Sequence, residues 1–242
     1  MDETEFDKFA TEYESLMRST MRVSGEGVDF FARYKVLDAA QVLATDTRIE
    51  SRIRVLDFGA GVGASTPHFQ QAFPDATVVC ADVSMRSLKV GHARFANASQ
   101  FVCFDGTTLP FVDNSFDLVF AACVFHHIPG AQHVALMREF ARIVAPQGRV
   151  MIFEHNPLNP ITRRIVADCP FDENAVLIAA RELRERMHMA GYQCDVAFRL
   201  FFPNFLRRLR FLERWLRWLP LGAQYYVSAC KPDAAAPELH RH

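Results

Sequence analysis

The chain has 242 residues, of which 50% are hydrophobic and 23% charged, a composition that is ordinary for a folded globular protein and excludes a mainly disordered chain. Its 27 Lys and Arg residues against 28 Asp and Glu residues give a net charge of −1, so bulk charge does not favour nucleic acid as a partner. The longest uninterrupted apolar stretch runs from Leu118 to Phe125, well short of the roughly 18 residues that indicate a membrane span. The length and composition suit one large domain or a domain with appendages.

The first predicted elements are two helices. Apolar side chains from Phe6 to Met17 fall on one helical face, and the opposite face is acidic. After the breaker Ser24-Gly25-Glu26-Gly27, a second helix is predicted from about Asp29 to Ala44. We expect residues 1–50 to form a helical cap that can close over the site of the main domain.

From Ile53 onward, short β-branched runs alternate with helical patterns. The predicted strands are 53–58, 77–81, 101–104, 118–122, 149–153, 193–202 and 224–230, and the predicted helices between them are 63–73, 84–96, 132–144 and 172–190. This alternation requires right-handed crossovers and predicts an α/β fold with a doubly wound, mostly parallel, Rossmann-like sheet over residues 51–232. Residues 233–242 are predicted to form a disordered tail. Ligands of such sheets bind beyond the carboxyl ends of the strands.

The strongest motif is an apolar strand that ends in an acid and runs into a glycine-rich turn before a helix, Val55-Leu56-Asp57-Phe58-Gly59-Ala60-Gly61-Val62-Gly63. Glycine permits positive φ and close approach of a ligand, and the helix N-terminus offers unpaired N–H donors. The spacing also fits the dinucleotide fingerprint, with Asp82 about 20 residues further on. However, the Asp57 carboxylate would repel a pyrophosphate and attract an ammonium group. S-adenosylmethionine carries an ammonium group and a sulfonium, and no phosphate.

At these residues the chain resembles the class I S-adenosylmethionine-dependent methyltransferases, and specifically the small-molecule branch that includes the ubiquinone and menaquinone biosynthesis enzymes. The similarity covers about Ile53 to Val150, with the motifs in the family's order. It implies that Asp57 helps to hold the amino group, that Asp82 accepts both ribose hydroxyls, and that Asp105 accepts from the adenine amino group. The cofactor-binding residues implied by the resemblance are Asp57, Phe58, Gly59, Gly61, Asp82, Val83, Asp105, Gly106 and Ala122.

The three acids also fit this cofactor on physical grounds. Carboxylates at the ends of neighbouring strands are costly to bury unless each has a donor, and an adenosyl amino acid supplies donors for all three. Each acid could instead cap the helix that follows it.

Paired histidines, His126 and His127, follow the fourth predicted strand and resemble the family's fourth motif. Methyl transfer is an in-line displacement, so the enzyme aligns the reactants and, for hydroxyl or carbon acceptors, removes a proton. Histidine titrates near neutrality and suits that task, although either ring could only pack or bond to the backbone. We expect His127 to face the acceptor as a base, with His126 as the second candidate.

A polar segment after the fifth predicted strand is expected at the same edge of the sheet. Asn159 followed by Pro160 is typical of an N-cap and the first residue of a short helix. The candidates for acceptor contacts here are His155, Asn156, Arg163 and Arg164. The two arginines could bind an anionic group of the acceptor; alternatively, they lie on a helix face exposed to solvent. The histidines show no metal-ligand spacing, and the six cysteines form no CxxC pair, so we expect no metal.

Residues 203–219 predict an amphipathic helix inserted before the last strand. Five arginines and one glutamate give it a net charge of +4, and Arg207, Arg210, Arg214 and Arg217 are predicted to form one cationic stripe. Such a helix could rest on an anionic membrane or admit a lipid-linked acceptor; the alternative is that its apolar face covers the protein's own core.

The predicted function is transfer of a methyl group from S-adenosylmethionine to a small-molecule or lipid-linked acceptor, with release of S-adenosylhomocysteine. The alternatives are a nicotinamide-dependent oxidoreductase and a non-catalytic binding module on the same fold. No nucleic acid partner is expected. The acidic N-terminus is unlike a targeting leader, so we expect a cytoplasmic protein, with peripheral contact to the inner face of a membrane as an open alternative.

Overall fold

The computed structural model describes residues 26–45 and 52–231 of the chain. The predicted helix from Phe6 to Met17 and the predicted tail at 233–242 lie outside the described residues. No helix in the two described ranges is long and apolar enough to cross a membrane.

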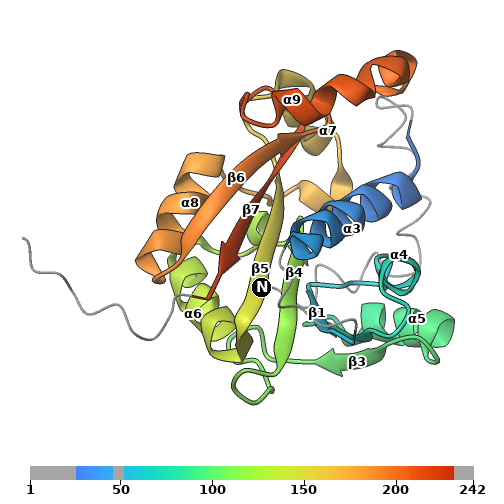
Figure 1. The fold of residues 1–242 in the computed structure, drawn as a ribbon, viewed down its shortest axis with the longest axis vertical. Helices are drawn as coiled ribbons and strands as arrows, with labels where there is room; N and C mark the ends of the chain where they lie inside the picture. The colour runs from blue at the N-terminus through green and yellow to red at the C-terminus, as the bar shows by residue number, and fades with distance from the viewer. Residues whose placement is uncertain (1–25, 46–51, 232–242) are drawn as a thin grey trace, which may run out of the picture.

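A seven-stranded sheet with the order β3-β2-β1-β4-β5-β7-β6 forms the centre of the fold (Figure 1). The strands are β1 (Arg54–Phe58), β2 (Thr77–Asp82), β3 (Gln100–Cys103), β4 (Phe116–Ala122), β5 (Val144–His155), β6 (Gln193–Arg199) and β7 (Gln224–Cys230). Strands β1 to β5 pair in parallel, whereas β7 runs antiparallel to both β5 and β6. The predicted doubly wound, mostly parallel α/β sheet is confirmed. Strand order reverses between β1 and β4, and their carboxyl ends therefore flank a ligand crevice.

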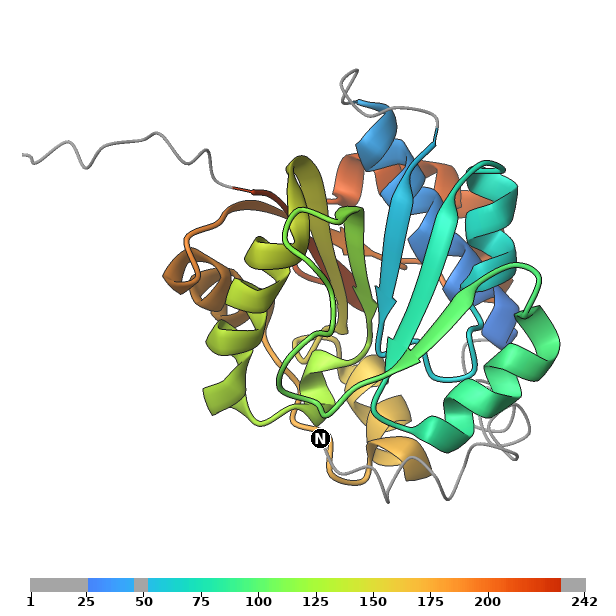
Figure 2. The same cartoon turned by 90° about the horizontal axis from the view of Figure 1, so that it is seen from below.

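Helices cover both faces of the sheet (Figure 2). They are α3 (Val28–Ala44), α4 (Thr66–Ala72), α5 (Met85–Phe95), α6 (His133–Ile143), α7 (Pro160–Ala167), α8 (Ala180–Met189) and α9 (Glu213–Leu216), with 3₁₀ segments η2 (Phe125–His127), η3 (Gly130–Gln132), η4 (Pro170–Asp172) and η5 (Asn204–Leu212). One apolar cluster joins the sheet to α6 and α8, and a second joins the other face to α3 and α4. The β1 side chains alternate between them, which directs Asp57 toward the α3 face and Phe58 toward α6.

Two predicted elements are shorter than expected. The strand predicted to reach residue 202 ends at Arg199, since Leu200 adopts a positive φ of 63°. The N–H groups of residues 200–202 then donate to the Glu213 carboxylate. The helix predicted from residue 172 begins only at Ala180, after a 3₁₀ turn that directs Asp172 toward the paired histidines.

The prediction of one amphipathic helix over residues 203–219 is wrong. The segment consists of the 3₁₀ turns of η5, interrupted at Leu206, and the short helix α9. Its arginines do not form one stripe. Arg210 is held by Glu26 at 2.6 Å, and Arg217 lies 3.7 Å from Asp38 of α3, so these two point to the body of the protein.

Candidate functional site

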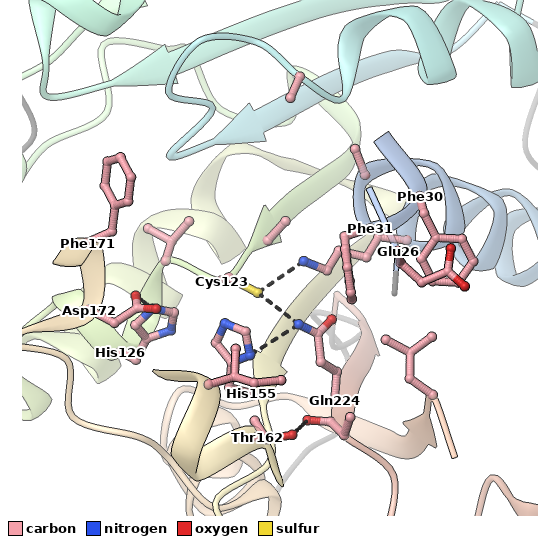
Figure 3. A pocket seen from close by; sticks show the side chains of 18 of the residues that line it. Glu26, Phe30, Phe31, Cys123, His126, His155, Thr162, Phe171, Asp172 and Gln224 are labelled. Carbon is pink, nitrogen blue, oxygen red and sulfur yellow. Dashed lines mark hydrogen bonds and ion pairs between the residues drawn. The ribbon is translucent and has the colours of Figure 1, made fainter. Parts of the chain in front are cut away.

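A cavity of about 930 Å³ opens beyond the carboxyl ends of β1, β2, β4 and β5. Its wall is formed by α3, the glycine turn, η2, α7, η4 and the segment after β6 (Figure 3). It therefore lies where the sheet topology predicts a ligand.

The glycine turn forms one end of this cavity. Gly59 and Gly61 have positive φ angles of 69° and 53°. A Cβ on Gly59 would lie 2.5 Å from a Val124 methyl group, so no larger residue fits there without displacing Val124. A Cβ on Gly61 would meet no atom within 4 Å, which leaves the backbone open to a ligand. Asp82 stabilises the turn because its Oδ2 accepts from Gly61 N at 2.8 Å.

Asp57 is a buried acid with one unpartnered oxygen. It is 2% exposed and lines the cavity, and its Oδ2 has no hydrogen-bond partner among the described residues. Burial, reinforced by the neighbouring Asp82, raises the pKa of Asp57 to about 7, while Ser65 and Lys35 act to lower it. This acid fits an ammonium group, which would supply both the missing donor and a compensating charge.

The structure brings some of the predicted cofactor residues to the cavity and not others. Asp57, Gly59, Gly61, Asp82 and Ala122 line it, whereas Phe58, Val83, Asp105 and Gly106 do not. Phe58 packs against Phe140 on the other face of the sheet, with ring centroids 5.0 Å apart. Asp105 caps its own turn: its Oδ1 accepts from the N–H groups of Thr107 and Thr108, which hold the pKa of this exposed carboxyl below its usual value. Asp105 thus caps a turn, and not the helix that the alternative predicted.

His126 is held between two carboxylates. Its Nδ1 lies 2.6 Å from Glu154 Oε2, and its Nε2 lies 3.3 Å from Asp172 Oδ1. Burial alone would lower the pKa of His126, but Glu154 and Asp172 raise it to about 10. The two carboxylates favour the imidazolium form of the ring and do not support His126 as the base, so its catalytic role stays a prediction.

His127 lines the cavity beside the same carboxylate. Its Nε2 lies 3.4 Å from Asp172 Oδ1, and its side chain is 11% exposed. Burial would raise the pKa of Asp172, but hydrogen bonds with both histidines hold it well below its usual value. The ligand atoms of His126, His127 and Asp172 lie within 4.8 Å of one another, close enough to hold a cation, a grouping that the sequence spacing did not indicate.

Only some of the residues predicted to contact the acceptor line the cavity. His155 and Arg164 line the cavity, whereas Asn156 and Arg163 do not. The prediction that Asn156 contacts an acceptor is wrong, because its buried amide donates to the carbonyls of Pro220 and Gly222. The predicted cap of α7 is confirmed, since the Asn159 side chain accepts from the N–H groups of the helix start.

Sequence reasoning missed several residues of the cavity. Lys35 of α3 is 6% exposed and donates to Cys123 Sγ at 3.0 Å. Nothing in the spacing of the predicted helix distinguishes this lysine. Cys123, which lines the cavity, and Glu154, which lies behind it against His126, stand at or directly after strand ends, the same signal that identified Asp57 and could have identified them. Asp172 and Gln224 also line the cavity and were missed.

The sequence is similar to known methyltransferases. A family model described as "Methyltransferase domain" matches residues 56–152. The chain is 34% identical over 119 residues to the ubiquinone/menaquinone biosynthesis C-methyltransferase UbiE of Ectopseudomonas mendocina, covering 46% of each chain. It is 30% identical over 162 residues to the biotin biosynthesis bifunctional protein BioHC of Cellvibrio japonicus, covering 66% of this chain and 30% of that protein. The chain thus spans less than half the length of these relatives.

Solved structures share the fold at lower identity. A SAM-dependent methyltransferase from Thermotoga maritima superposes with a TM-score of 0.65 at 18% identity, covering 94% of this chain and 98% of that chain. One from Aquifex aeolicus gives a TM-score of 0.56 at 17% identity, covering 82% and 92%.

The fold, the cavity and the family match over residues 56–152 together support a class I S-adenosylmethionine-dependent methyltransferase.

Proposed function

We propose that this protein transfers the methyl group of S-adenosylmethionine to a small-molecule acceptor and releases S-adenosylhomocysteine. The observation that carries the proposal is Asp57, a buried carboxylate beside the glycine turn whose Oδ2 has no hydrogen-bond partner among the described residues. A dinucleotide would bring its pyrophosphate to this turn, against the charge of Asp57, whereas an amino acid cofactor brings an ammonium group.

Four residues of the cavity wall would hold the cofactor. Asp57 would bind its amino group, and the glycine turn, with Gly59 packed against Val124 and the backbone of Gly61 open, would lie against its amino acid portion. Asp82 would bind the ribose hydroxyls, because its carboxylate lies at the end of β2, lines the cavity and accepts from Gly61 N of the glycine turn. When bound, the cofactor supplies an electrophilic methyl group on its sulfonium.

His127 is the proposed base for the acceptor. It is next to a protonated ring, lines the cavity and lies near the Asp172 carboxylate, which can orient its imidazole. A carboxylate beside an imidazole also stabilises the positive charge that the ring gains when it takes a proton.

The proposed domain runs from 51 to 232, with residues 1–50 as its cap. The part of this cap that is described, α3, supports the proposal because Phe30, Phe31 and Lys35 contribute to the cavity wall.

We further propose that the acceptor is lipid-linked and that the protein meets it at a membrane surface. The segment around η5 and α9 forms part of the cavity mouth through Phe201, Phe202 and Phe205. The same segment exposes aromatic and aliphatic side chains together with arginines. Phe205 is 83% exposed and Trp218 is 74% exposed. Further exposed side chains of this segment are Phe211, Trp215, Leu221, Arg207, Arg208 and Arg214. Aromatic residues with cationic neighbours are typical of peripheral membrane contacts.

Calorimetry with the purified protein tests the cofactor, and release of S-adenosylhomocysteine with a panel of acceptors tests turnover. We expect binding of S-adenosylmethionine and none of NAD(P)H. Binding of the dinucleotide instead would overturn the proposal. Tight binding without turnover on any acceptor would favour the non-catalytic module.

Flotation with phosphatidylserine-containing vesicles tests the membrane proposal. The protein is expected to float, and Trp215→Ser with Trp218→Ser to reduce the floating fraction. Val112→Ser, an exposed apolar change outside the segment, is the matched control. An unfloated wild-type protein would exclude the membrane contact without affecting the methyltransferase proposal.

A further inference from the structure

Cys123 is a strained residue that faces the cavity from the end of β4 (Figure 3). Its φ is 59°, a left-handed conformation that non-glycine residues seldom adopt. The backbone is fixed there by a hydrogen bond from Cys123 N to the Phe153 carbonyl at 2.8 Å. Such strain persists where the surrounding structure imposes it, and it concentrates at functional sites.

The group that faces this sulfur is a buried ammonium. Lys35 Nζ donates to Cys123 Sγ at 3.0 Å, and Lys35 is 6% exposed. A buried ammonium is costly unless a negative charge compensates it, and a thiolate supplies that charge. Gln224 supports the arrangement, because its Nε2 lies 3.8 Å from Sγ and also donates to His155 Nδ1 at 3.2 Å.

The charges around Cys123 favour the thiolate. Burial alone raises the pKa of the Cys123 thiol, but Lys35 and then His155 lower it to about 6, against the opposing effect of Glu154. The titratable groups that face it are Lys35 and Tyr34 from α3, His155 and Glu154 from β5, His126 from η2 and Tyr225 from β7.

Other cysteines of the chain show the opposite tendency. Burial raises the pKa of Cys80 to about 12 and that of Cys169 to about 11. Burial also raises the pKa of Cys194 above its usual value. Cys123 is therefore distinguished from these by its partner rather than by its residue type.

We propose that Cys123, held by Lys35, is a nucleophilic thiolate that bonds covalently to conjugated carbonyl compounds entering the cavity. A sulfur electron pair forms the bond to the β carbon of the compound, and the C=C π pair shifts toward the carbonyl oxygen. The resulting enolate can pair with the Lys35 ammonium and takes up one proton from water. The product is a neutral thioether, and no oxidant or reductant is required.

The site lies on the acceptor side of the cavity, so its consequence for turnover rests on the proposed function, whereas the covalent chemistry does not. A thioether at Cys123 would occupy the space beside His155 and Gln224. We therefore expect conjugated carbonyl compounds to block acceptor binding.

Alkylation of the full chain by N-ethylmaleimide, a conjugated carbonyl compound, tests the inference. Adducts at each cysteine are quantified by peptide mass spectrometry after short exposures between pH 5 and 9, without S-adenosylmethionine. At pH 6 we expect Cys123 to react at least about 20-fold faster than Cys194, because its larger thiolate fraction outweighs the lower nucleophilicity of a low-pKa thiolate.

The variant Lys35→Met removes the compensating charge. Its Cys123 alkylation at pH 6 is expected to fall about 20-fold, with the half-maximal rate moving above pH 8. Lys89→Met, an exposed lysine of α5, is the matched control and should keep the wild-type profile. Thermal melting establishes that both variants fold.

Two results would overturn the inference. One is equal alkylation of Cys123 and Cys194 in the wild-type protein at pH 6, a comparison that needs no variant. The other is a folded Lys35→Met protein with the wild-type pH profile. Calorimetry on the same samples separates the two proposals, since absent S-adenosylmethionine binding with rapid Cys123 alkylation contradicts only the methyltransferase proposal.

Discussion

The two ends of the cavity are built in different ways. The glycine-turn end uses backbone and strand-end residues that are close in sequence, from Asp57 to Gly61, with Asp82 on the adjacent strand. The histidine end combines side chains from separate elements: Lys35 of α3, His127 of η2 and Asp172 of η4. The first end can be preserved by a short motif, whereas the second depends on how distant segments pack. This difference predicts different responses to substitution.

At the histidine end, the largest effect is expected from His127→Ala. Loss of a positioned base should lower kcat/KM by about 10²- to 10⁴-fold, while affinity for S-adenosylmethionine stays unchanged. The measurement is S-adenosylhomocysteine release with an accepted substrate, and His92→Ala, on the exposed face of α5, is the control. Intact turnover of His127→Ala at every pH would exclude the ring as the base.

Glu154→Ala tests whether the buried ion pair at the histidine end contributes to the stability of the fold. The change leaves the imidazolium of His126 buried without its closest carboxylate and removes the acceptor of two backbone N–H groups. We expect a loss of about 3–5 kcal/mol in the free energy of unfolding, measured by urea denaturation. Glu185→Ala removes an exposed pair with Arg181 and should change stability by less than about 0.5 kcal/mol. Equal losses in both variants would contradict the buried ion pair.

At the glycine-turn end, Asp57→Asn tests the carboxylate that would hold the amino group. The exchange keeps the shape and removes the charge, so S-adenosylmethionine affinity should fall by about 1–3 kcal/mol, or roughly 5- to 150-fold. Calorimetry measures the loss, and Asp105→Asn, at an acid that caps its own turn, should affect affinity less. A larger loss of affinity in Asp105→Asn than in Asp57→Asn would contradict the assignment of Asp57 to the amino group.

The pH dependence of binding gives the smallest expected effect. Because the pKa of Asp57 is raised to about 7, the acid is neutral below that pH and charged above it. Affinity for an ammonium ligand should therefore rise with pH, by about tenfold between pH 6 and pH 8 if Asp57 alone titrates. Binding near pH 7 should release a fraction of a proton, seen as a dependence of calorimetric heat on the buffer. The Asp57→Asn protein should lack this release.

Some elements could be predicted from sequence because local rules determine them. The cap of α7 follows from Asn159 and Pro160, and the glycine turn follows from residues that can adopt positive φ. The segment at 203–219 could not be predicted in this way. Its amphipathic spacing suggested one helix, but Glu213 binds the backbone of residues 200–202 and Arg210 binds Glu26, contacts that cross the fold.

The sequence by itself determined the mostly parallel sheet, the glycine turn and the acids at the strand ends, because these depend on hydrophobic period, the alternation of strands and helices and glycine conformation. Only the tertiary structure decided which acids reach the cavity. It also made His126 a buried cation and joined Lys35 to Cys123 across 88 positions of the chain. The physical reason is that burial and charge pairing depend on three-dimensional neighbours, and residues distant in sequence supply those neighbours at the histidine end.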